Sequence, residues 1–140
     1  MIFNVDPIGK PRQTRSTFSG GKKRPRIAAY HAFRDVVRLQ ARGWEPGGEL
    51  ALRFEIAMPK SWSGVKKSRM LGVPHASKPD LDNLVKAFLD CWEEDKHVWW
   101  IQAEKYWSTS GAIIVDGAVR QVPRCWPRHR PRLYIVDGEP

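Results

Sequence analysis

Hydrophobic positions recur with a helical period between residues 28 and 41. The apolar side chains fall three or four positions apart, and the pattern stops at Gly43. The remaining positions are polar and partly basic. We therefore expect an amphipathic helix that packs its apolar stripe on a sheet and turns a partly basic face outward. The apolar residues of this pattern are Ala29, Ala32, Phe33, Val36, Val37, Leu39 and Ala41.

Residues 50–58 alternate between apolar and polar side chains, which predicts a strand with one face buried. Three other short apolar runs, at residues 2–5, 98–107 and 112–115, also predict strands. We expect the last two to pair with each other. The inward face of the alternating strand should hold Leu50, Leu52, Phe54, Ile56 and Met58.

A second helix is predicted over residues 81–92, with a buried side that includes Leu84 and Phe88. Asp82, Lys86 and Asp90 recur at i, i+4 and i+8, which places them together on its other face. These elements indicate an α+β fold, in which two helices pack on a small mixed sheet. We assign residues 1–118 to one compact domain and residues 119–140 to a loosely ordered Arg/Pro-rich basic tail.

The chain of 140 residues carries a formal net charge of +9, so we expect it to bind nucleic acid. A membrane surface is the competing partner, but no apolar run approaches the roughly 20 residues of a membrane-spanning helix. The cysteines Cys91 and Cys125 match no zinc-binding spacing. We interpret both as reduced thiols of a cytoplasmic protein.

Basic residues concentrate in two polar segments, 10–26 and 60–69. A solvated loop is the common fate of such a run, and contact with DNA phosphates is an equally supported alternative here. Trp62, within the second segment, could stack on an unpaired base, although anchoring its own loop is the more usual role. The candidate DNA-binding residues are Lys10, Arg12, Arg15, Lys22, Lys23, Arg24, Arg26, Lys60, Lys66, Lys67 and Arg69.

Residues 78–86 bring acid into this basic chain, with Asp80 and Asp82 at the predicted start of the second helix. One explanation is capping, because Asp is a preferred N-cap and complements the helix dipole. The other is a metal site, since carboxylate oxygens select hard cations such as Mg²⁺ or Mn²⁺. Such ions promote phosphodiester hydrolysis, and Lys86 would add positive charge for the transition state.

The stretch KPDLDNLVKAFLD at residues 78–90 resembles the defining motif of the RusA-like endodeoxyribonucleases, Holliday junction resolvases of bacteria and their phages. Residues 7–12 resemble that family's basic N-terminal segment, and residues 58–62 its turn after a strand. The resemblance implies a Mg²⁺-dependent homodimer that cuts opposed strands of a four-way DNA junction in recombination and repair. Mn²⁺ is expected to substitute, the water nucleophile to be metal-activated, and no small-molecule cofactor to be needed.

The resemblance also implies the site residues. Asp80 and Asp82 match metal-binding aspartates, Lys86 matches the essential lysine, and Asp95 matches the third aspartate, with Glu94 as the alternative ligand. All four residues matched this way are expected to be catalytic. Two other functions stay open: a junction-binding protein without cleavage, whose acids serve as caps, and a metal-dependent nuclease for another branched or single-stranded DNA.

Overall fold

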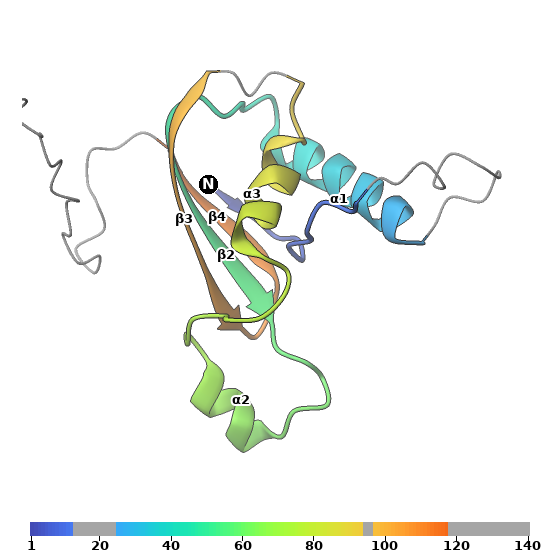
Figure 1. The fold of residues 1–140 in the computed structure, drawn as a ribbon, viewed down its shortest axis with the longest axis vertical. Coiled ribbons are helices and arrows are strands. Elements are labelled where there is room, and N and C mark those ends of the chain that lie inside the picture. Colours follow the sequence, from blue (N-terminus) through green and yellow to red (C-terminus); the bar gives the residue numbers. More distant parts are fainter. Residues whose placement is uncertain (13–24, 94–96, 118–140) are drawn as a thin grey trace, which may run out of the picture.

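A four-stranded mixed sheet and three helices make up the fold (Figure 1). The computed structural model describes residues 1–12, 25–93 and 97–117. This architecture agrees with the predicted α+β class, but it has three helices where two were expected. In chain order the elements are β1 (Ile2–Phe3), α1 (Pro25–Ala41), β2 (Gly48–Ala57), α2 (Gly64–Met70), α3 (Leu81–Leu89), β3 (Val98–Ser108) and β4 (Ala112–Gly117).

The strand order in the sheet is β1-β4-β2-β3, so the predicted pairing of the last two strands is wrong. β3 runs parallel to β2, from Gly48 opposite Val98 to Ala57 opposite Ser108. β4 pairs antiparallel with both β2 and β1. The chain returns through α3 to the free edge of β2, a crossover that makes β3 parallel, and β4 then takes the opposite edge of β2. Adjacency in sequence therefore does not give adjacency in this sheet.

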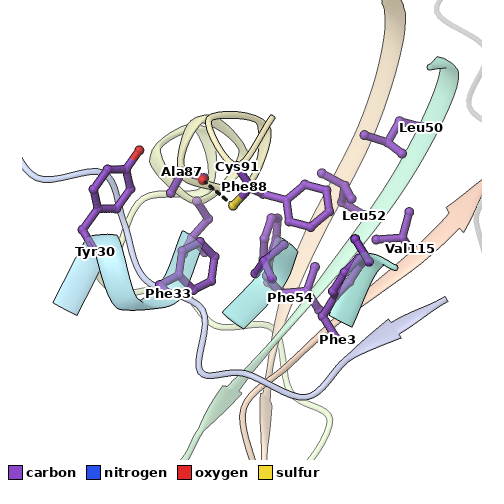
Figure 2. Packing of buried hydrophobic residues seen from close by; sticks show 14 residues of the cluster. Phe3, Tyr30, Phe33, Leu50, Leu52, Phe54, Ala87, Phe88, Cys91 and Val115 are labelled. Carbon is purple, nitrogen blue, oxygen red and sulfur yellow. Dashed lines mark hydrogen bonds between the residues drawn. The ribbon is translucent and has the colours of Figure 1, made fainter. Parts of the chain in front are cut away.

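One face of the sheet is covered by α1 and α3, and the core lies between these helices and the sheet (Figures 1 and 2). The alternating strand buries Leu50, Leu52, Phe54 and Met58 as predicted, while Ile56 is partly buried. Phe88 of α3 packs edge-on against Phe3 of β1, with ring centroids 5.6 Å apart. Burial of these aromatic and aliphatic side chains removes apolar area from water and stabilises the packing of α3 against the sheet.

The helix boundaries follow from local chemistry. α1 begins with Pro25, whose missing N–H costs nothing in a first turn, and it ends where Arg42 (φ 50°) and Gly43 (φ 83°) turn left-handed. α3 is three residues shorter than predicted. After Leu89 the N–H groups of Cys91 and Trp92 bond to carbonyls three residues back, which tightens the chain out of the α-helix. Cys91 is a buried free thiol, and burial raises its pKa to about 12. Cys125 lies outside the described residues.

The basic segment at residues 60–69, expected as a loop or short helix, forms most of the helix α2, which stands away from the body beyond the ends of β2 and β3 (Figure 1). Trp62 packs against Trp107 of β3, with ring centroids 4.9 Å apart, and the Lys66 ammonium lies over the Trp62 ring, 4.1 Å from its centroid. The anchoring role expected of Trp62 is therefore the one observed. Among the described helices, none is long and apolar enough to cross a membrane.

Candidate active site

Asp80 occupies the N-cap position of α3, yet its carboxylate makes no capping hydrogen bond. Ser63 provides an internal comparison, because it begins α2 with nearly the same backbone conformation (φ −63°, ψ 156° against φ −67°, ψ 147°). The Ser63 hydroxyl accepts the expected bond from the Lys66 N–H at 3.3 Å. Capping therefore does not account for the Asp80 side chain, which lies exposed at the start of α3.

Asp82 lies one turn from Lys86 on the exposed side of α3. The Lys86 ammonium donates to Asp82 Oδ2 at 3.1 Å, and the two side chains are 70% (Asp82) and 63% (Lys86) exposed. The hydrogen bond from Lys86 holds the pKa of the Asp82 carboxyl below its usual value. Two carboxylates and an ammonium thus face solvent within the first two turns of one helix, where a polyanion can reach them.

Asp90 does not join Asp82 and Lys86, although the i, i+4, i+8 spacing predicted a shared cluster. Its Oδ2 atom accepts two bonds of 2.6 Å, one from the Lys10 ammonium and one from the Tyr30 hydroxyl. Burial opposes the charged form of Asp90, but these two bonds outweigh burial and lower its pKa. Burial together with the Asp90 carboxylate raises the pKa of the Tyr30 hydroxyl. Asp90 is therefore a structural ion-pair residue that ties α3 to α1 and to the N-terminal segment.

The N-terminal segment that carries Lys10 docks onto the first turn of α3. The Lys10 N–H donates to the Asn83 carbonyl at 3.4 Å, and the Asn83 side-chain amide donates back to the Lys10 carbonyl at 3.2 Å. A Cβ on Gly9 would lie 2.7 Å from Asn83 Nδ2 and 3.2 Å from Pro79 Cβ, so only glycine fits this close approach without displacement. The segment is held by Asn83 and Asp90, two motif residues that flank Lys86.

The other candidate DNA-binding residues fall into three groups. Arg12 and Arg26 are exposed, near the start of the chain and at the first turn of α1 respectively. Lys60, Lys66 and Arg69 are exposed on or beside α2, whereas Lys67 is half-buried and donates to the Lys60 carbonyl. Arg15, Lys22, Lys23 and Arg24 lie outside the described residues.

The residues at the start of α3 suit a hard divalent cation, because Asp80 and Asp82 offer carboxylate oxygens and Asp80 has no capping bond to give up. Within residues 1–12, 25–93 and 97–117, no three His, Cys, Asp or Glu side chains group closely enough to hold a metal. The proposed third ligand, Asp95 or its alternative Glu94, lies outside these residues. The described part of the chain therefore supplies two of the three expected carboxylates.

Sequence reasoning missed the partners that organise this region. Tyr30 was not singled out, although a tyrosine on the buried side of a helix needs a partner for its hydroxyl. The sequence places Asn83 only in the motif and Asp90 on a face with Asp82, because their observed partners, Lys10 and Tyr30, lie far away in the chain. The buried face of α1 holds Tyr30, Phe33, Val37 and Ala41, whereas Ala29, Ala32, Val36 and Leu39 of the predicted apolar face are exposed.

The mixed sheet, the basic chain and the exposed carboxylates at the start of α3 define an α+β protein whose candidate site suits a divalent cation. Comparison with family models gives the family: the model described as endodeoxyribonuclease RusA matches residues 4–116 of the 140. The chain therefore belongs to the RusA endodeoxyribonuclease family. No curated protein and no solved structure matches the chain at a significant level.

Family membership confirms the predicted resemblance and supports nuclease activity with DNA as the partner. Nucleases of this family generally need a divalent metal ion. The match ends at residue 116, and the basic tail at residues 119–140 lies outside both the match and the described residues.

Proposed function

We propose that this protein is a Mg²⁺-dependent endonuclease that resolves Holliday junctions by paired phosphodiester hydrolysis, in DNA recombination and repair. The observation that carries the proposal is the Asp80 carboxylate, which stands exposed at the N-cap of α3 without capping it, two residues before Asp82 of the Asp82–Lys86 pair. These three residues lie in the motif that the resemblance identifies and within the residues matched by the family model.

Asp80 and Asp82 would hold Mg²⁺, together with Asp95. When bound, a divalent cation lowers the pKa of water and neutralises charge that develops on phosphate oxygens. Lys86 contributes a second positive charge at the same site. Its ammonium donates to Asp82 Oδ2, and with a cation on that carboxylate it would be available to contact a phosphate oxygen.

DNA binding would use the exposed basic residues on either side of α3. Lys10 and Arg12 come from the docked N-terminal segment, and Lys60, Lys66 and Arg69 from the α2 region. Contacts between these cations and DNA phosphates relieve the repulsion among the like charges. They also release counterions condensed on the DNA, which favours binding. The Lys10–Asp90 bond holds the N-terminal segment against α3.

A homodimer would supply the two active sites that paired cutting of a four-way junction requires. A two-fold axis presents the same surface of both subunits to the symmetric junction, and so places both sites on strands of like polarity. Within the described residues, the sheet edge formed by β3 offers apolar surface for association, since Trp99 is 71% and Trp100 42% exposed. Sedimentation of the purified protein gives the oligomeric state directly.

A cleavage panel tests the proposed substrate. A synthetic four-way junction, a fork, a single strand and a linear duplex are each incubated with the protein in Mg²⁺. We expect symmetric nicks in the junction and much slower cutting of the other three. Faster cutting of the fork or single strand would assign a nuclease for another structure. Binding without cutting of any substrate, in Mg²⁺ or Mn²⁺, would favour the non-catalytic alternative.

A further inference from the structure

Lys105 lies on the inward-facing side of β3, where the alternation calls for an apolar residue. Its register partner on β2 is the buried Phe54, and the partners of its neighbours two positions away, Ala103 and Trp107, are Leu52 and Ile56. A lysine on the helix-covered side of a sheet loses hydration of its ammonium. This costs free energy unless the ammonium makes hydrogen bonds within the protein. Lys105 is half-buried and finds those partners in the segment that leads into α3.

The Lys105 ammonium donates to the Ser77 carbonyl at 2.6 Å and to the Pro79 carbonyl at 2.7 Å. Its own carbonyl accepts from the His75 N–H at 3.0 Å. Three bonds from one residue therefore hold alternate positions of residues 75–79 against the edge of β3. Bonds in which one partner is charged are shorter and stronger than neutral ones, which suits them to fixing a loop.

The Pro79 carbonyl, which accepts from the Lys105 ammonium, belongs to the peptide unit that links Pro79 to Asp80. A group that fixes this carbonyl fixes the orientation of the Asp80 backbone, and with it the direction in which the carboxylate leaves the start of α3. The Asp80 carbonyl in turn accepts the Leu84 N–H at 3.1 Å in the first helical turn. Lys105 thus reaches the candidate metal ligand through a single peptide bond.

We propose that Lys105 is a positioning residue of the active site, which holds the loop before α3 so that Asp80 and Asp82 bind the divalent cation together. This inference rests on the proposed function for its metal, but the loop contact itself stands apart from any catalysis. Lys105 orients a ligand through the backbone and does not act on DNA. Residues that orient metal ligands in this way typically change metal affinity by about 10–100-fold when replaced.

The test compares Lys105→Met with wild type in two measurements on the protein without DNA. Methionine keeps the length and packing of the aliphatic stem and removes the donors. We expect Mn²⁺ affinity, measured by electron paramagnetic resonance, to fall by about tenfold. We also expect amide NMR signals of residues 76–84 to shift and the Leu84 amide to exchange its hydrogen faster.

Lys105→Arg is the rescue variant. It restores donors for both carbonyls and should return Mn²⁺ affinity to within about threefold of wild type. If the methionine variant does not fold, Lys105→Gln takes its place, with one donor group left.

Arg53→Met is the matched control, because Arg53 lies on the adjacent strand with its register partner at Glu104, on the other face of the sheet. It removes the same charge and should leave Mn²⁺ affinity within about twofold, as expected for a distant surface charge. Equal weakening by the control would show a net-charge effect and overturn the proposal. Unchanged Mn²⁺ affinity and exchange in Lys105→Met would overturn it as well, even if cleavage were lost. A wild type that binds no Mn²⁺ would refute the proposed nuclease site, whereas the exchange data would still report whether Lys105 holds the loop.

Discussion

The Lys86 ammonium and the Asp82 carboxylate are 3.1 Å apart, one turn along α3, so the lysine occupies a carboxylate that we expect to bind metal. The pair is exposed and contributes little to stability, as surface ion pairs do. Its significance lies in competition: a cation that binds Asp82 must displace Lys86 or share the oxygen with it.

Replacing Lys86 by Met should therefore separate metal binding from catalysis. Because a competing positive charge is removed, Mn²⁺ affinity of the free protein should stay equal or rise by about threefold, the effect of one exposed charge at short range. Cleavage of a four-way junction should fall by at least about a hundredfold, since a charge that stabilises the transition state is gone. Calorimetry and a nicking assay measure the two quantities. Parallel loss of both would mean that Lys86 organises the carboxylates and does not act on phosphate.

Asp80→Ala should cost little stability, although Asp80 holds an N-cap position. Removing a side chain that caps a helix costs about 1 kcal/mol, but the Asp80 carboxylate makes no such bond. In about 0.5 M salt, which screens the helix dipole, the free energy of unfolding should change by less than about 0.5 kcal/mol. Urea denaturation gives this value. A loss above 1 kcal/mol would support capping as the role of Asp80.

Ser63→Ala gives the contrasting case in α2, where the hydroxyl does cap. Since α2 buries no residue, the effect should be local. We expect faster exchange of the Lys66 amide, which donates to Ser63 Oγ.

The Asp90 ion pair predicts a pH dependence of stability. The pKa of Asp90 is lower in the folded protein than its usual 3.8, so the folded state binds fewer protons at this group than the unfolded state. Its stabilising contribution is present above pH 3.8 and is lost as the pH falls through the folded-state pKa. Asp90→Asn keeps an acceptor for Tyr30 and loses the charge that pairs with Lys10. It should lower the free energy of unfolding by about 1 kcal/mol at pH 7.

That difference between wild type and Asp90→Asn should shrink as the pH falls below 3.8. Asp35→Asn, which makes the same charge change on the exposed side of α1, should show a smaller difference at pH 7. A gap between Asp90→Asn and wild type that stays constant down to about pH 2, below the expected range of folded carboxyl pKa values, would contradict the ion-pair account.

The local elements were predictable from sequence, because each depends on residues close in the chain. Alternation predicted β2 and its buried face, the 3.6-residue period predicted α1, and Gly43 marked its end. The pairing of β3 with β2 was not predictable in the same way. A strand pattern shows that an edge will be paired but carries no record of which strand pairs there.

In the candidate site too, contacts between sequence neighbours were predictable and contacts between distant residues were not. The acids and the lysine at the start of α3 are neighbours in sequence, so helical periodicity predicted the Asp82–Lys86 contact. The bond from Lys10 to Asp90 spans 80 residues, and those from Lys105 to the Ser77 and Pro79 carbonyls join a strand to a loop. Local sequence patterns do not predict bonds between residues this far apart in the chain. The third carboxylate stays a prediction, since Asp95 and Glu94 lie outside the described residues.

The central claim is that the carboxylates of α3 support metal-dependent cleavage of DNA junctions, and Asp82→Asn tests it most directly. The variant keeps side-chain size and removes one charge from the site. The measurement is the rate of Mg²⁺-dependent nicking of a synthetic four-way junction, with junction binding measured in Ca²⁺ and Asp35→Asn as the control for charge. We predict that Asp82→Asn binds the junction as wild type does and leaves it uncut, while Asp35→Asn cuts normally. Nicking by Asp82→Asn at the wild-type rate would contradict the account.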